Sequence, residues 1–215
     1  MNNLEKKVYQ ACIDANIEQF TRIISNITDP KQKEQVEKMF NNHMKEITEF
    51  IINSQFWKTW KLNEEFIKKL HKISYPPGYK ETKKDKYGND VVFMIPWEYK
   101  LFNNFPRVDK NIVSFEIKKL INKYNKGIKK ASDKFNFIWE IILDFFKIHP
   151  FWHWNWMMAS LLLDILLLRN NLESIWLKKH YLNPEIKQQI YNSIEKAIIT
   201  KNYNIFIENI KKIKN

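Results

Sequence analysis

The chain has 215 residues and a mass of 26.3 kDa, which suits one domain or a domain with a helical extension. Hydrophobic residues make up 44% of it, enough to build a core, so disorder of the whole chain is excluded. There are three glycines, which excludes the glycine-rich loops that bind phosphates and dinucleotides. The single cysteine, Cys12, excludes a disulfide framework and a cysteine-based zinc site.

The formal net charge of +12 could indicate a nucleic-acid or anionic-membrane partner. Lysine supplies almost all of the 36 basic residues, and the only arginines are Arg22, Arg107 and Arg169. Arginine is the side chain that binds bases and phosphates with two parallel hydrogen bonds. Frequent lysine, asparagine and isoleucine are typical of an AT-rich genome. The composition therefore favours a solvated lysine surface over nucleic-acid binding.

Apolar residues recur at helical spacing along most of the chain. The pattern predicts helices over about residues 4–26, 30–54, 63–73, 113–125, 132–148, 184–200 and 205–213. The first two form an amphipathic N-terminal extension, residues 1–55, which either packs on the core or mediates a homodimer. Residues 56–215 form the main domain.

The segment of about residues 78–97 differs in kind because it is rich in proline, glycine and turn-forming residues. The turn signal of residues 87–90 precedes a run of hydrophobic residues, 91–95. This pattern predicts a small β-hairpin, or flap, on an otherwise helical body. The fold class is therefore mainly α.

Pro150 disfavours helix at the residue before it, so we expect the preceding helix to end near His149. Asn155 is a good N-cap for a helix of about residues 156–169, which is apolar on nearly every face and should lie in the middle of a bundle. A histidine facing a helix N-terminus can act as a general base beside a bound anion. A structural role for such a histidine is more common, and both interpretations stay open.

The loop resembles the signature of the Fic (Fido-fold) proteins, His-Pro-Phe-x-Asp-Gly-Asn-Gly-Arg-x-x-Arg, at His149, Pro150, Phe151 and Asn155. The similarity continues in the leucine-rich residues 161–177 and the helices after them, and it covers about residues 60–215. It implies a Fido-fold helical bundle around the central helix of about 156–169, with the flap of about 78–97, so that residues 56–215 are a Fic-like domain.

The resemblance implies an enzyme that uses ATP and Mg²⁺ to transfer AMP to a protein hydroxyl. In that scheme His149 would be the general base and Asn155 would help to bind the phosphates. Pro150 and Phe151 would shape the loop, with Phe151 anchored in the core. The flap would bind the target protein by adding a strand to its edge.

The sequence departs from the signature at the positions that bind phosphate and metal. The acidic position is His153, and magnesium prefers oxygen ligands. The two glycine positions are Trp154 and Trp156, which we expect to avoid positive φ and to occlude the nucleotide site. The two arginine positions are Met157 and Ser160, so the charged contacts to the phosphates are lost.

These departures predict a Fic-family protein, resembling protein adenylyltransferases, whose activity is weak, altered or lost. His149 is then either a base in a remodelled site or a relic. The alternative is a catalytically inactive Fido-fold interaction module, and a second alternative is a basic nucleic-acid-binding protein. No metal site is expected, because Pro150 interrupts the helix that would align His149 with His153.

We expect a protein target bound through the flap. The apolar run 157–168 contains Asp164 and is too short to cross a bilayer, and the first residues do not form a signal segment. These features predict a protein without a membrane span that is cytoplasmic or delivered into another cell.

Overall fold

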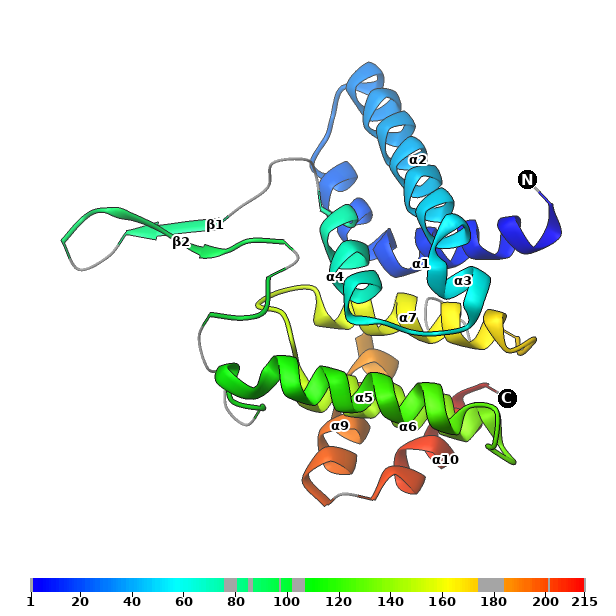
Figure 1. Cartoon of the computed structure of the whole chain (residues 1–215). Helices are drawn as coiled ribbons and strands as arrows, with labels where there is room; N and C mark the ends of the chain where they lie inside the picture. The colour runs from blue at the N-terminus through cyan, green and yellow to red at the C-terminus, as the bar shows by residue number, and fades with distance from the viewer. Residues whose placement is uncertain are drawn as a thin grey trace.

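The computed structural model describes residues 2–75, 81–84, 87–96, 98–101, 107–173, 184–200 and 202–214. The described helices are α1 (Asn3–Ser25), α2 (Pro30–Asn53), α3 (Gln55–Thr59), α4 (Glu64–Ile73), the 3₁₀ turn η1 (Lys110–Ile112), α5 (Val113–Gly127), α6 (Lys134–Ile148), α7 (Asn155–Arg169), α9 (Pro184–Thr200) and α10 (Tyr203–Lys214). Two strands, β1 (Glu81–Lys84) and β2 (Asp90–Met94), form one antiparallel sheet. The predicted mainly-α class is confirmed (Figure 1).

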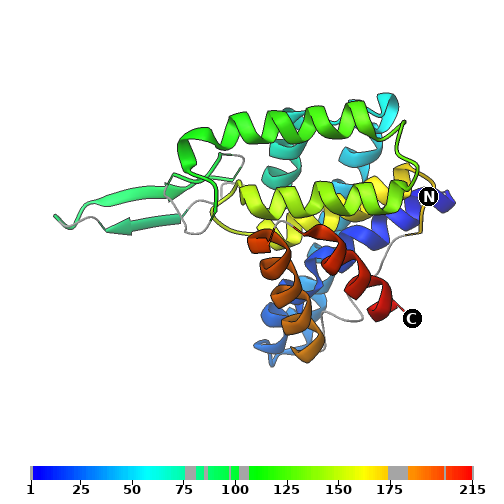
Figure 2. The same cartoon turned by 90° about the horizontal axis from the view of Figure 1, so that it is seen from below.

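Helix α7 is the centre of the molecule, as its lack of a polar face predicted. Its residues from Leu161 to Leu168 are all buried, including the charged Asp164. Helix α1 packs against it on one side and α6 on the other, so that α7 lies between two groups of helices (Figure 1). On the α6 side of the molecule, α5 and α6 run side by side, and α9 and α10 form a second pair (Figure 2).

The N-terminal helices share this core. Val8 and Cys12 of α1, and Met44, Ile47 and Ile51 of α2, are buried in the same cluster as α7. The first half of α2 extends beyond the body beside the end of α1 (Figure 1), where the rings of Phe20 and Phe40 stack at 4.1 Å. Packing on the core, one of the two alternatives left open by the sequence, is therefore what α1 and the second half of α2 do.

Local sequence signals explain several of the helix ends. Asp29 caps α2 by accepting a hydrogen bond from the Lys31 N–H, with Pro30 as the first helical residue.

The last residue of α7, Arg169, places its guanidinium 3.5 Å from the ring centre of Trp60, and this contact joins α7 to the segment after α3. The sequence pattern missed α3, because five residues are too few to show a helical period.

The predicted flap is a hairpin that projects from the body (Figure 1). Thr82 pairs with Val92, Lys83 with Val91 and Lys84 with Asp90. Gly88 lies in the turn with φ of 85°, a backbone conformation that glycine adopts without strain. Residues 78–80, 85, 86 and 97 of the predicted flap lie outside the described residues.

The burial of α7 generates a stability prediction. Leu162 is fully buried, so Leu162→Ala leaves a cavity and should lower the free energy of unfolding by about 3 kcal/mol. The matched control is Leu4→Ala, on a side chain that is 42% exposed, which should change it by less than about 0.5 kcal/mol. Urea denaturation measures both variants, and equal losses would contradict the central position of α7.

Candidate functional site

The loop of residues 149–154 joins α6 to α7 through two left-handed residues. Helix α6 ends at Ile148, next to His149 as predicted, and His149 is its C-cap, with φ of 50° and an N–H that donates to the Phe145 carbonyl at 2.8 Å. Trp154 at the other end has φ of 60°. Each left-handed residue costs about 1–2 kcal/mol, so other contacts must hold the loop in this shape.

Asn155 provides the first of those contacts. Its Oδ1 accepts the Phe151 N–H at 3.0 Å, and its Nδ2 donates to the Phe151 carbonyl at 2.7 Å. The prediction that Asn155 is the N-cap of α7 is wrong: Trp154 holds the cap position, and Asn155 is the first helical residue. The physical reason is that the Asn155 amide already pairs with the loop backbone.

The pairing of Asn155 with Phe151 also bears on which nitrogen of the neutral His149 ring carries the proton. The Phe151 backbone determines which end of the Asn155 amide is nitrogen, and that nitrogen lies 3.2 Å from His149 Nδ1. An amide nitrogen can only donate, so Nδ1 accepts. In the neutral imidazole this contact favours the tautomer with the proton on Nε2.

Burial keeps His149 neutral. Desolvation lowers the pKa of its imidazole to about 4, helped by the positive charges of Arg107 and Lys100. The half-buried ring therefore carries no charge near pH 7.

Phe151 is fully buried and lies on His71 of α4, with ring centres 3.7 Å apart and planes within 7°. The His71 ring is also hydrogen-bonded to the His153 backbone, and burial lowers its pKa to about 3. A neutral ring on α4 thus packs against the loop. The sequence analysis missed His71, because nothing near position 71 links it to a loop almost eighty residues later.

Two tryptophans, one at the end of the loop and one in the first turn of α7, pack against other aromatic rings. Trp154 stacks on Tyr75 with ring centres 3.9 Å apart, and Trp156 packs against Tyr191 at 4.5 Å. The expectation that tryptophan avoids positive φ is wrong for Trp154. The stacking with Tyr75 offsets the backbone strain, since aromatic pairs contribute about 0.5–1.5 kcal/mol beyond burial.

A cavity of about 330 Å³ remains beside His149. It is lined by Arg107, Phe146, His149, Trp152, His153, Trp154, Asn155, Trp156, Tyr191, Ile194 and Glu195. Arg107 forms an ion pair with Glu195 of α9 there. Arg107 was noted in the sequence only as one of three arginines, and only the fold brings it to the predicted loop.

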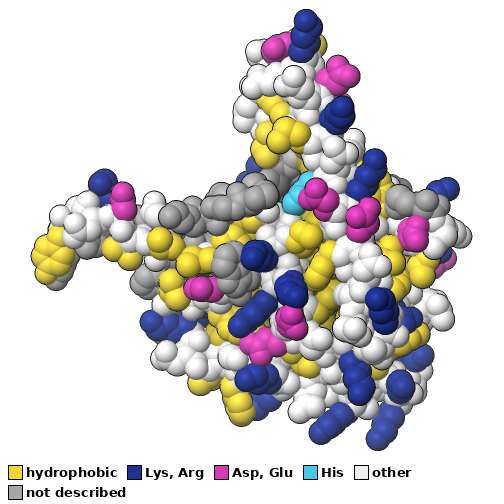
Figure 3. All heavy atoms as spheres, turned by 45° about the horizontal axis from the view of Figure 1, so that its top comes forward, with side chains coloured by type: hydrophobic (Ala, Val, Ile, Leu, Met, Phe, Trp, Pro, Cys, Tyr) yellow, Lys and Arg dark blue, Asp and Glu magenta, His cyan; other side chains and the backbone are white. Residues whose placement is uncertain are grey.

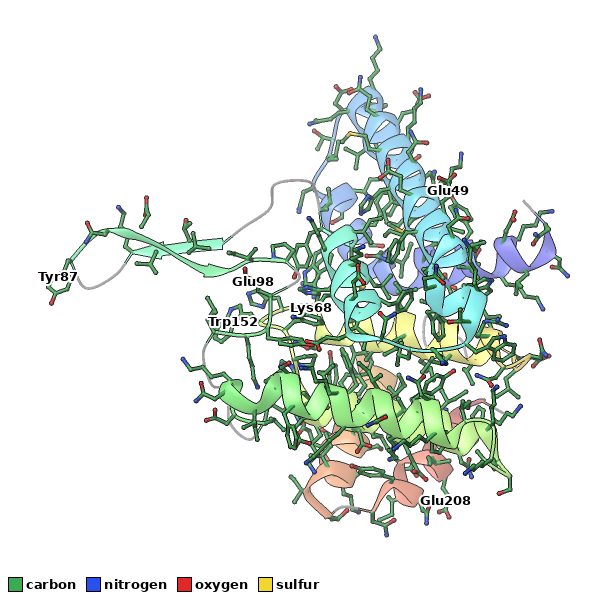
Figure 4. The ribbon with its side chains drawn as sticks, in the orientation of Figure 1. Glu49, Lys68, Tyr87, Glu98, Trp152 and Glu208 are labelled. Atoms are coloured by element: carbon green, nitrogen blue, oxygen red, sulfur yellow. The ribbon has the colours of Figure 1, made fainter. Side chains whose placement is uncertain are left out.

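The base of the hairpin is attached to this loop. The Lys100 N–H donates to the Pro150 carbonyl at 2.9 Å, and its ammonium lies 3.5 Å from the Ile148 carbonyl oxygen. Lys100 is buried, and desolvation together with the nearby Arg107 lowers its pKa to about 8. Figure 4 shows Trp152 near the hairpin base and Tyr87 at the hairpin tip.

Three other positions depart from the signature. Met157 is buried, Ser160 is half-buried and His153 is exposed. No group of three His, Cys, Asp or Glu residues that could hold a metal occurs among the described residues. In that same part of the chain, no helix has the length and apolarity needed to cross a membrane.

Because the pKa values of His71 and His149 are lowered, we expect the protein to lose stability in acid. Each has a folded pKa below its ordinary value, so the unfolded chain binds their protons first as the pH falls. Their contribution is complete above about pH 6.5 and is lost toward the folded values. At pH 5 the loss should be about 2 kcal/mol for each histidine.

Urea denaturation at pH 7 and pH 5 measures this loss. In His71→Gln, whose side chain does not titrate, the loss between these two pH values should be about 2 kcal/mol smaller than in the unchanged chain. An identical loss in the variant would contradict the assignment of His71 as a buried neutral group.

A second prediction concerns the Asn155 amide. Asn155→Ala leaves the Phe151 N–H and carbonyl without partners in a buried place and should lower the free energy of unfolding by about 3 kcal/mol. The control is Asn209→Ala on α10, which loses one partly buried hydrogen bond to Ser193 and should cost about 1 kcal/mol or less. Equal losses in thermal or urea unfolding would show that the amide does not hold the loop.

No protein-family model matches the sequence, and a search of curated proteins gives no match either. The structure is similar to the crystal structure of a Fic domain-containing signaling protein from Bacteroides thetaiotaomicron, with a TM-score of 0.66 and 16% sequence identity. The similarity covers 100% of this chain and 87% of that chain, so it includes the N-terminal helices. The chain therefore has the fold of the Fic proteins, as the residues of the loop indicated.

Proposed function

We propose that this chain is a Fic-fold protein that has lost ordinary AMP transfer and acts by binding a protein partner. The observation that carries the proposal is the hydrogen bond from Asn155 Nδ2 to His149 Nδ1. A general base needs a lone pair on the nitrogen that faces the reacting hydroxyl. In His149 one nitrogen accepts from Asn155, and the other carries the proton.

Tautomer exchange would not restore the base. A proton on Nδ1 would point at the Asn155 amide hydrogens, and the amide cannot turn over without breaking both of its bonds to Phe151. The low pKa of His149 also makes the ring a weak proton acceptor at neutral pH. The geometry therefore favours the interpretation of His149 as a structural relic.

The residues that would hold the phosphates and metal support the same conclusion. The Asn155 amide is engaged by the loop, and His153 stands where a magnesium ligand would be. Arg107 could replace a lost arginine, but its guanidinium is paired with Glu195. ATP and Mg²⁺ remain expectations from the family resemblance, which these residues do not favour.

A role in protein binding is supported by the hairpin. Its two strands pair only with each other among the described residues, so each has an outer edge that a partner strand could extend. Lys100 connects the hairpin base to Pro150, so that the hairpin and the loop form one surface.

Incubation with α-labelled ATP and magnesium, alone and with cell extract, tests the loss of AMP transfer. We expect no protein label above that given by His149→Ala, because the unprotonated nitrogen of the His149 ring is engaged by Asn155. The same experiment with Arg107→Lys, which keeps the positive charge at the cavity, shows whether any label depends on the guanidinium group. Label that requires His149 would contradict the proposal.

Proline substitutions in the two hairpin strands test whether the partner binds through the hairpin. Thr82→Pro combined with Val92→Pro removes two backbone donors from facing positions of the hairpin. A partner isolated with the unchanged chain should bind this variant at least about tenfold more weakly, and His149→Ala should keep its affinity. The melting temperature of the body should not change, since the hairpin projects from it. If the proline variant and the unchanged chain bind the partner with equal affinity, the partner binds at another surface.

A further inference from the structure

A groove of about 470 Å³ lies where α2, α3 and α4 meet, away from the loop of residues 149–154. It is lined by Glu46, Glu49, Phe50, Asn53, Ser54, Gln55, Phe56, Asn63, Glu65, Phe66 and Lys69. None of these residues lines the cavity beside His149. The groove is therefore a separate surface.

Three phenylalanines give the groove an apolar floor. Phe50 and Phe66 stack with ring centres 5.8 Å apart and planes within 12°, and Phe56 lies 4.9 Å from Phe66. Phe56 and Phe66 are buried, and Phe50 is half-buried at the open side. Because the rings come from three helices and support one another, the floor is formed before anything binds.

The rim of the groove is acidic in a chain of formal net charge +12. Lys69 is the one basic residue among the lining residues, and it pairs with Glu65 at 2.6 Å. Glu46 lies 3.5 Å from His43. Glu49 is exposed and forms no ion pair with any described residue. Figure 3 shows acidic side chains beside hydrophobic ones on the face formed by α2 and α4.

The end of α2 adds negative potential to the same place. This 24-residue helix ends at Asn53, which lines the groove, and it has no basic residue in its last turn. The carbonyl end of a helix carries a partial negative charge that a cation stabilises. The N-terminal ends of α3 and α4, at Ser54 and Asn63, line the same groove and carry the opposite partial charge. The helix ends therefore offset one another, and it is the carboxylates that favour a positively charged occupant.

We propose that this groove binds a short basic segment of a partner protein, with its apolar side chains on the phenylalanine floor and its lysine or arginine side chains along Glu46 and Glu49. The long stems of these basic residues can cover apolar surface while their charged ends reach the carboxylates. Aromatic faces attract the same cations. A nucleic acid would be repelled by this rim.

A titration of isotope-labelled protein with a blocked peptide of alternating lysine and leucine, followed by NMR, tests the proposal. The perturbed amides should be those of residues that line the groove, and affinity should fall as salt is added. Glu49→Lys should weaken binding about tenfold, because it reverses the charge that has no partner.

The matched control is Glu208→Lys, an exposed glutamate on α10 that lies far from Glu49 (Figure 4). It makes the same change in net charge and should alter the affinity by less than about twofold. A peptide with glutamate in place of lysine should not bind. Thermal unfolding establishes that both variants are folded.

Equal weakening by Glu49→Lys and Glu208→Lys would show an effect of net charge alone and would overturn the proposal. Binding of the glutamate peptide, or perturbation centred outside the groove, would overturn it too. If Glu49→Lys instead changes the sedimentation of the protein without peptide, the occupant is a second copy of this chain and the proposed partner segment is wrong.

Discussion

The two hydrogen bonds between the Asn155 amide and the Phe151 backbone are the constraint on which the site depends. They close the loop between α6 and α7, and they fix the direction of the amide. The fixed amide in turn determines which nitrogen of His149 accepts a hydrogen bond. One side chain therefore gives the loop its shape and engages a ring nitrogen of His149, which is the contact that carries the proposed loss of AMP transfer.

The surrounding helices reinforce this arrangement. His71 supports Phe151 from α4, Tyr75 stacks on Trp154, and Lys100 connects the hairpin base to Pro150. These contacts come from two parts of the chain, the end of α4 and the hairpin base, and they support a loop in which two residues are left-handed. The fold is that of the Fic proteins, and aromatic packing and one ion pair, Arg107 to Glu195, surround the loop.

Much of the fold could be predicted from local signals. Pro150 predicted the end of α6, and Asp29 with Pro30 predicted the start of α2. The absence of a polar face predicted the central position of α7. The site residues outside the loop could not be predicted, because Arg107 reaches it only through the tertiary fold. The position of Trp154 was also beyond local rules, since stacking on Tyr75 overrides the backbone preference of tryptophan.

The most direct test of this account is the tautomer and pKa of His149, measured by NMR of the imidazole nitrogens with assignment by His149→Gln. The account predicts a proton on Nε2, an unprotonated Nδ1, and a pKa near 4. A proton on Nδ1 at neutral pH, or titration at the ordinary histidine value, would show that the ring is available as a base and would contradict it.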